Sequence, residues 1–201
     1  VLPSGFTFDY TNVLNEWAVT DADMRSEFDN VANAVKAAAK VRFNGVVDGH
    51  LSKDGTPEKV LFPQLPYIED DHLNSEAVLT RLEELGAHAK ESIDAVVSFG
   101  IGGSFLGGKV LFDVHCGEFW NQKTREQRNG YPQLYFSGNN ADSKRTKALI
   151  DMLTDSAAQK GGNFKVMLIV ISKSGSTIEP MSNFMVVQDA LLQAGIGVEV
   201  V

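Results

Sequence analysis

The sequence is poor in the residues that build covalent and metal cross-links. It contains 201 residues but one cysteine, Cys116, and four histidines. A single thiol cannot form an internal disulfide, which indicates a reducing compartment and excludes the disulfide-rich secreted class. The histidines are His50, His72, His88 and His115. They have no metal-ligand spacing with one another or with Cys116, so we predict no metal site.

Basic residues are also in short supply. There are 18 Lys and Arg against 26 Asp and Glu, a net charge of -8, which argues against nucleic acid or an anionic membrane as a general partner. The run Lys123–Arg128 is interrupted by Glu126 and predicts an exposed helix face. No apolar run is long enough to cross a membrane, and the first residues lack a basic-then-apolar signal pattern. We therefore expect a cytoplasmic protein that binds neither nucleic acid nor membrane.

The first third of the chain predicts helices joined by a long connection. Phe6, Phe8, Tyr10, Leu14 and Trp17 form an apolar set that we expect to pack onto a larger body. Thr20 and Asp21 can cap a helix, and apolar residues then recur at helical spacing to about Lys40. Glycines and prolines punctuate residues 45–66, which predicts a connection. A second helix is predicted from Asn74 or Ser75, and the residues assigned to its buried face are Val78, Leu79, Leu82 and Leu85.

From residue 94 the pattern changes to alternating strands and helices. We predict strands at 95–99, 133–137, 166–171 and 198–201, with helices at 104–114, 143–153 and 179–193. Nearly continuous apolar strands separated by helices predict an α/β fold with a mainly parallel, doubly wound sheet covered on both faces, a three-layer αβα sandwich. The domain division expected is a helical arm with its connection at 1–66 and the α/β domain at 67–201. The chain stops on a strand, so we expect that this domain is truncated.

A glycine-rich loop follows the first of these strands. In Ser98–Lys109, glycines between a strand and a helix let the backbone approach an anion at the positive end of the helix dipole. The dinucleotide fingerprint fails at Phe105, and the nucleotide phosphate loop fails at Val110, where Ser or Thr should hold magnesium. A nucleophile elbow centred on Ser104 would need glycine in place of Leu106. Two interpretations stay open for this loop alone, an oxyanion site and a tight turn without a ligand.

A second strand–loop–helix lies about seventy residues later. Ile171–Pro180 carries four hydroxyls, Lys173 and one glycine, donors that can surround a phosphate. Helix capping by Ser176 or Thr177 is the alternative, and it would explain one hydroxyl but not four and a lysine. Both loops leave the carboxyl ends of strands, where open α/β sheets bind ligands. Together they predict a site for a phosphorylated small molecule.

The two loops resemble the two signatures of the glucose-6-phosphate isomerase family, whose members contain two sugar isomerase (SIS) domains. These stretches are Gly100-Ile-Gly-Gly-Ser-Phe-Leu-Gly107 and Ile171-Ser-Lys-Ser-Gly-Ser-Thr-Ile-Glu-Pro180. The supporting stretches are Phe8-Asp-Tyr10, Leu65-Pro66 and Phe136-Ser-Gly-Asn-Asn140. The departures from the family pattern are Gly108, Ser176 and Ile178. None of these three removes a predicted phosphate donor.

This resemblance implies roles for six residues. Gly103 and Ser104 correspond to groups that bind the sugar phosphate region, and the loop that wraps the phosphate corresponds to Ser172, Lys173, Ser174 and Thr177. The family interconverts glucose 6-phosphate and fructose 6-phosphate through an enediolate. Its glutamate base, ring-opening histidine and late lysine lie in the second half of the enzyme, so we expect no catalytic residue in this chain.

The same resemblance implies that residues 67–201 are the first SIS domain, that no metal or organic cofactor is needed, and that the intact enzyme is a homodimer acting on a hexose 6-phosphate. The alternative is a non-catalytic SIS domain that senses a sugar phosphate for regulation. A nucleotide-binding phosphate-loop protein is a third interpretation, and Val110 argues against it.

Overall fold

The computed structural model describes residues 5, 7, 9–14, 19–52, 54–70 and 72–201. Phe6, Phe8 and Trp17, predicted to pack onto a larger body, lie outside the described residues. The chain forms two compact units, Val1–Thr80 and Arg81–Val201. The division predicted at residue 66 stays a prediction.

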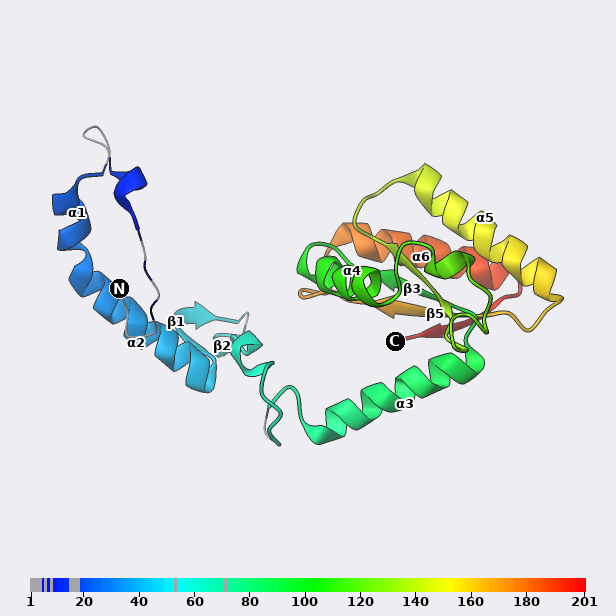
Figure 1. Ribbon diagram of the computed structural model, residues 1–201, viewed down its shortest axis with the longest axis horizontal. Coiled ribbons are helices and arrows are strands. Elements are labelled where there is room, and N and C mark those ends of the chain that lie inside the picture. The colour runs from blue at the N-terminus through cyan, green and yellow to red at the C-terminus, as the bar shows by residue number, and fades with distance from the viewer. Residues whose placement is uncertain (1–4, 6, 8, 15–18, 53, 71) are drawn as a thin grey trace. The chain divides into compact units, whose positions relative to one another are not determined.

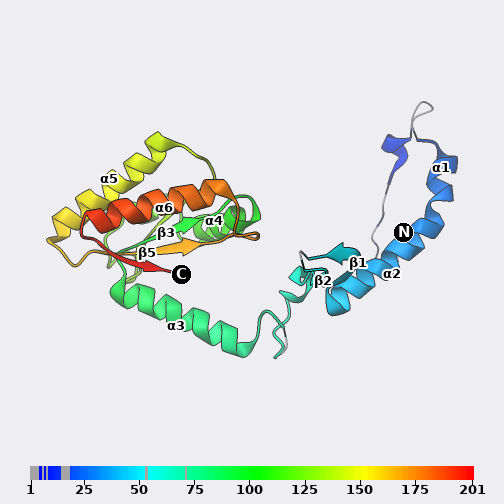
Figure 2. The same cartoon turned by 180° about the vertical axis from the view of Figure 1, so that it is seen from behind.

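The first unit contains short helices and a hairpin. Its elements are η1 (Thr11–Val13), α1 (Asp21–Ser26), α2 (Phe28–Asn44), β1 (Val46–Leu51), β2 (Pro57–Lys59) and η2 (Phe62–Gln64). The predicted cap is confirmed, since the Thr20 side chain accepts from the Asp23 amide in a capping box. The predicted single helix is instead interrupted at Glu27. The stretch predicted as a plain connection contains the antiparallel hairpin β1–β2, which lies at the C-terminal end of α2 (Figure 2).

The second unit alternates strands and helices, and α3 leads into it. Helix α3 (Glu76–Ser92) begins in the first unit and continues into the second. The other elements of the second unit are β3 (Ala95–Phe99), α4 (Gly103–His115), η3 (Trp120–Gln122), β4 (Gln133–Ser137), α5 (Ser143–Lys160), β5 (Lys165–Val170), α6 (Ile178–Gln193) and β6 (Gly197–Val200) (Figure 1). The four strands pair in the order β4-β3-β5-β6, and every pairing is parallel. The predicted strand and helix order is confirmed.

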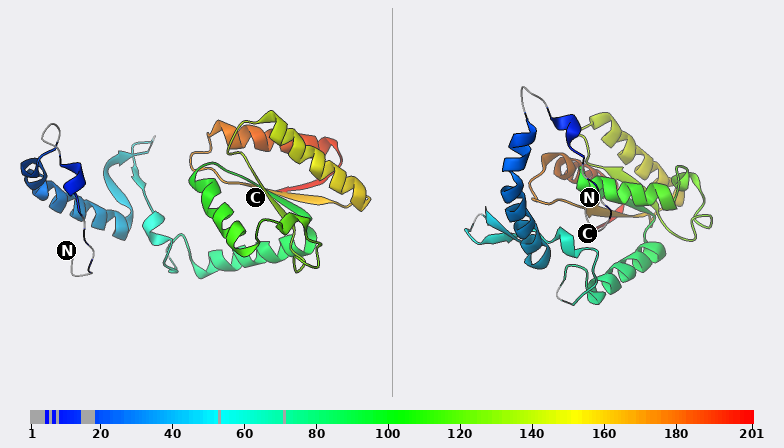
Figure 3. Two further views of the ribbon diagram at one scale, coloured as in Figure 1. Left: turned by 45° about the horizontal axis from the view of Figure 1, so that its top comes forward. Right: turned by 60° about the vertical axis from the view of Figure 1, so that its left-hand side comes forward.

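Alternate residues of β3 pack against different helices. Ala95, Val97 and Phe99 are fully buried in one cluster with Leu153 of α5 and Val187 of α6. Residues of the opposite face, including Val96 of β3 and Met167 of β5, form a second cluster with Leu85 and Ala89 of α3. Helix α4 covers the β4 end of this second face, because Phe105 and Phe112 both contact the Phe136 ring edge-on. Figure 3 shows the resulting layers, which confirm the predicted three-layer sandwich.

Asp94 fixes the register of three strands at the amino edge of the sheet. Its amide donates to the Lys165 carbonyl at 2.9 Å and its carbonyl accepts from the Gln133 amide at 3.0 Å. Its carboxylate accepts from the Lys165 amide at 2.9 Å and from the Lys160 ammonium at 2.6 Å. In this register Phe99 pairs with a residue of β4 on one side and of β5 on the other. The three strands therefore end level with one another at the carboxyl edge.

Three predictions about individual segments are wrong. The Lys123–Arg128 run forms turns, not an exposed helix face, and Arg128 is only 6% exposed. Its guanidinium donates to the backbone carbonyls of Lys123 and Tyr131. These hydrogen bonds stabilise the loop between the two residues. Helix α5 ends at Lys160 rather than 153. On α3, Val78 and Leu82 are 36% and 56% exposed although both were predicted to be buried.

Within the described residues, no helix has both the length and the apolar character needed to cross a membrane.

Candidate functional site

The chain reverses its winding direction between β3 and β5. After β3 it continues to β4 on one side of the sheet, and then crosses to β5 on the other side of β3. Helix α4, which follows β3, lies on one face, whereas α6, which follows β5, lies on the other. The loops leaving β3 and β5 start side by side, because the Ile171 amide donates to the Phe99 carbonyl at 2.9 Å. Diverging loops at such a switch point leave a crevice where α/β proteins bind ligands.

The β3–α4 loop brings free backbone donors to this crevice. Gly102 is the N-cap of α4 and has no side-chain cap. Gly103 and Ser104 are the first two residues of the helix, and the Ser104 amide donates to the Ile101 carbonyl at 3.2 Å. In the described part of the chain, the amides of Gly102 and Gly103 and the Ser104 hydroxyl have no hydrogen-bond partner. These donors lie at the positive end of a helix dipole, where they can bind an anion.

Two glycines let three loops converge at the carboxyl edge. A Cβ on Gly100 would lie 2.4 Å from the Ser104 carbonyl oxygen, so the backbone there approaches α4 too closely for any side chain. Gly138, with φ +83°, lies after β4, and a Cβ there would be 2.9 Å from Pro180 Cα and 3.1 Å from the Gly100 nitrogen. The Gly100 amide donates to the Ser137 carbonyl at 3.2 Å. The loops after β3 and β4 and the first turn of α6 are therefore in direct contact.

Two hydroxyls of the β5–α6 loop shape the loop itself. The Ser172 hydroxyl oxygen accepts from the Gly175 amide at 3.0 Å. The Ser174 hydroxyl oxygen accepts from the Ser176 amide at 3.2 Å and from the Ser176 hydroxyl at 2.9 Å. These local bonds fold the chain back on itself, as serine side chains do in turns. The hydroxyl protons of Ser172 and Ser174 stay available, because both oxygens act as acceptors.

Other donors of this loop make no hydrogen bond within the described residues. Thr177 is the N-cap of α6 but its side chain makes no capping bond, and the Ser176 hydroxyl donates to Ser174, so neither side chain caps the helix. Within the described residues, the Lys173 ammonium, the Thr177 hydroxyl and the amides of Lys173 and Ser174 have no partner. Lys173 is exposed and Thr177 half-buried. A free cation with hydroxyl and amide donors can bind a phosphate dianion.

The surroundings of Glu179 and Cys116 do not favour a catalytic role for either residue. Glu179 lies in the first turn of α6, where its negative charge is favourable beside the positive end of the helix dipole. Burial raises the pKa of the Cys116 thiol, although nearby Lys123 opposes this, so the thiol is a poor nucleophile. No three His, Cys, Asp or Glu side chains among the described residues group as a metal site.

No family model matches the chain. It is 34% identical over 113 residues to glucose-6-phosphate isomerase from Pediococcus pentosaceus and 36% identical over 113 residues to that of Latilactobacillus sakei. It is 38% identical over 105 residues to the enzyme of the same name from Staphylococcus aureus strain Newman. This chain is similar to glucose-6-phosphate isomerases. The resemblance predicted from its two loops is confirmed.

The similarity to glucose-6-phosphate isomerases covers only part of this chain and only part of each relative. It extends over 56% of this chain for the first two relatives and 52% for the third, but over only 23% and 20% of their own lengths. The chain thus matches less than a quarter of each relative. The roles of Gly103, Ser104, Ser172, Lys173, Ser174 and Thr177 stay predictions, which the geometry makes chemically reasonable.

The structure also shows two buried polar residues beside this site that the sequence had not singled out. Thr146 of α5 and Asn183 of α6 are 7% and 5% exposed, and their side chains are 2.6 Å apart. A sequence signal exists for Asn183, since it stands four and eight residues before the buried Val187 and Leu191. A polar residue in a buried helical stripe indicates an internal hydrogen-bond network.

Proposed function

We propose that this chain supplies the sugar-phosphate-binding part of a glucose-6-phosphate isomerase, which interconverts glucose 6-phosphate and fructose 6-phosphate through an enediolate. The observation that carries the proposal is the pairing of two donor-rich loops at the switch point between β3 and β5. The glucose-6-phosphate isomerases similar to this chain support the choice of substrate.

The proposed roles follow from which donors are free. Lys173 supplies the full positive charge, and the amides of Gly103 and Lys173 supply directional hydrogen bonds to the phosphate oxygens. The hydroxyls of Ser104 and Thr177 add neutral donors from the two helix starts. Ser172 and Ser174 bind through their remaining hydroxyl protons and also keep the loop folded. Fixing the phosphate end of the sugar orients the C1–C2 region for proton transfer, which is a positioning contribution to catalysis.

We place the proton-transfer step outside these residues. Enediolate formation requires a general base and stabilisation of an oxyanion, and we assign the base to a part of the enzyme outside this chain. A homodimer, a cytoplasmic location and independence of metal and organic cofactors belong to the same proposal. A regulatory SIS domain would bind the same ligand without turning it over.

The test of this proposal is the phosphate specificity of Lys173. Lys173→Ala in the intact protein should weaken binding of a hexose 6-phosphate by about 10- to 100-fold, because a charge-assisted bond is worth about 1.5–3 kcal/mol. Binding of the unphosphorylated sugar should change by less than about twofold, since it lacks the dianion. Calorimetric titration with both ligands measures the two changes.

Lys165→Ala is the matched control. Lys165 begins β5 at the amino edge of the sheet, whereas Lys173 follows β5 at the carboxyl edge. Each variant therefore removes one positive charge, at opposite ends of the same strand. Only the variant at the carboxyl edge should lose phosphate selectivity. Equal losses for the phosphorylated and unphosphorylated sugar would refute the assignment of Lys173.

A further inference from the structure

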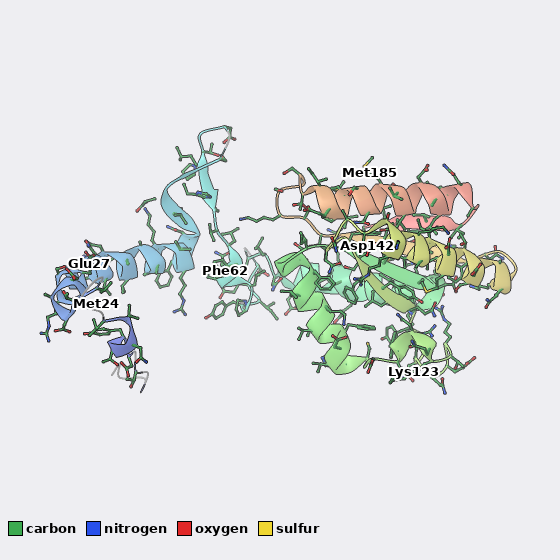
Figure 4. All side chains as sticks on the ribbon, turned by 90° about the horizontal axis from the view of Figure 1, so that it is seen from above. Met24, Glu27, Phe62, Lys123, Asp142 and Met185 are labelled. Atoms are coloured by element: carbon green, nitrogen blue, oxygen red, sulfur yellow. The ribbon has the colours of Figure 1, made fainter. Side chains whose placement is uncertain are left out.

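A buried polar network joins α5, α6 and the loop after β4. The Asn183 side-chain amide donates to the carbonyls of Asn140 and Glu179, at 3.0 Å and 2.8 Å. Its oxygen accepts from the Thr146 hydroxyl at 2.6 Å. The Thr146 hydroxyl is also 2.9 Å from the Asp142 carbonyl, so its proton is shared between two acceptors. Figure 4 shows Asp142, at the start of α5, beside α6.

The partners of Asn183 define how its amide is oriented. Two carbonyl oxygens face the nitrogen, which has two protons, and one hydroxyl faces the oxygen. The flipped amide would set oxygen against two carbonyls and is excluded by its surroundings. Both side chains are more than nine-tenths buried, so a lost partner would not be replaced by bulk water. The network therefore holds its members in one arrangement.

This arrangement connects directly to the β5–α6 loop. Glu179, whose carbonyl Asn183 holds, is two residues after Thr177 and next to Pro180. Pro180 is fully buried and lies against Gly138, at the start of the Gly138–Asp142 loop. The Asn140 carbonyl, which Asn183 also holds, belongs to that loop. Asn183 thus ties the first turn of α6 to the segment against which that turn packs.

We propose that Asn183 and Thr146 are positioning residues for the phosphate site. Neither carries a free donor to a ligand. They hold the first turn of α6 against the Gly138–Asp142 loop, so that Lys173 and Thr177 stand in their binding arrangement before the ligand arrives. Preorganised donors lose less freedom on binding, which raises affinity without any new contact. This inference rests on the proposed function for the identity of the ligand, but the positioning itself does not depend on it.

The experiment compares three variants on α5 of the full chain. Thr146→Val keeps the shape of the side chain and removes its proton donor, whereas Thr146→Ser keeps the donor. Thr154→Val is the control, because among the described residues the Thr154 hydroxyl bonds only to carbonyls of its own helix, those of Ile150 and Asp151. Affinity for glucose 6-phosphate is measured by titration, and backbone amide chemical shifts are recorded without ligand.

Thr146→Val should weaken glucose 6-phosphate binding by about three- to tenfold, the effect of one hydrogen bond. Thr146→Ser should restore affinity to within about twofold of the parent. In the ligand-free spectra, the amides of residues 173–178 should shift in Thr146→Val but not in Thr154→Val. Asn183→Ala, which removes the same contact from the α6 side, gives a second measurement if Thr146→Val does not fold.

A purely structural role would lower the melting temperature of both valine variants and leave the affinity and the shifts of residues 173–178 unchanged. That result overturns the inference. If instead the proposed function is wrong, the parent chain will not bind glucose 6-phosphate. The amides of residues 173–178 will still shift in Thr146→Val, so the two failures can be told apart.

Discussion

At the scale of single residues, the candidate site divides its polar groups between two tasks. Ser172 and Ser174 accept hydrogen bonds from amides of their own loop, which keeps the turn folded. Lys173, Thr177 and Ser104 make no such bonds within the described residues. Removing a shaping hydroxyl and removing a free donor should therefore differ, since the first changes the loop and the second changes only what the loop can bind.

Gly138 shows the same dependence of the site on backbone packing. Gly138→Ala adds a Cβ 2.9 Å from Pro180 Cα at a φ of +83°. The left-handed conformation costs about 1 kcal/mol for alanine, and forced overpacking adds about 1–3 kcal/mol. We expect the free energy of unfolding to fall by about 2–4 kcal/mol in urea titrations.

Gly161→Ala provides the comparison for Gly138. Gly161 has a φ of +75° at the C-cap of α5, with no atom within 4 Å of the added Cβ, so only the conformational cost applies. The free energy of unfolding of Gly161→Ala should therefore fall by about 1 kcal/mol. If the free energy of unfolding falls equally in the two variants, the added methyl group at Gly138 does not clash with Pro180 in solution.

At the scale of elements, the turn of the β1–β2 hairpin is held by one carboxylate. Asp54 accepts from the Ser52 hydroxyl, from the Thr56 hydroxyl at 2.7 Å and from the Thr56 amide at 3.1 Å. Hydrogen bonds from the Ser52 side chain, and then from Thr56, lower the pKa of Asp54 from 3.8 to about 2. A carboxyl with a depressed pKa in the folded state stabilises the turn above its unfolded pKa, and this contribution is lost as the pH falls towards 2.

The Thr56 amide proton should therefore titrate with a midpoint near pH 2 in NMR spectra, and this transition should disappear in Asp54→Asn. A midpoint near 3.8, the ordinary value, would mean that the hydrogen bonds of the turn do not form in solution.

The parallel sheet could be predicted from the sequence because its two central strands, β3 and β5, are largely buried on both faces. Val96 and Val97 pack against opposite layers, so β3 is apolar at every position but Ser98, and the predicted bounds of β3 and β4 match the structure. Strand β1 was missed because it is largely exposed and contains Gly49 and Asp48, so no periodic apolar signal exists. The interruption at Glu27 was missed because no glycine or proline marks it.

Only the part of the candidate site that is local in sequence could be predicted. Its loops consist of consecutive residues, so Lys173 and Ser104 could be recognised from local motifs. Thr146 and Asn183 are 37 residues apart and meet only because α5 and α6 pack on one face of the sheet. Arg128 was assigned to a solvated surface, since a charge run does not show which backbone carbonyls the side chains reach.

At the scale of the whole molecule, binding and chemistry should separate. The 201-residue chain carries both donor-rich loops, and its similarity extends over 23% or less of each enzyme named above. We expect the isolated chain to bind a hexose 6-phosphate without interconverting glucose 6-phosphate and fructose 6-phosphate. The reason is that positioned phosphate donors lower the barrier only when a general base acts on the same bound sugar.

A coupled assay of fructose 6-phosphate formation, run beside calorimetry on the same sample, measures both properties. Lys173→Ala should weaken binding by about 10- to 100-fold, as in the intact protein, which separates specific binding from background. Turnover by the isolated chain that Lys173→Ala also abolishes would place a catalytic base within these 201 residues and contradict our assignment of the chemistry. Binding without turnover, even in a protein encoded by the complete reading frame, would instead favour the regulatory SIS domain, because a sensor needs the phosphate donors but no base.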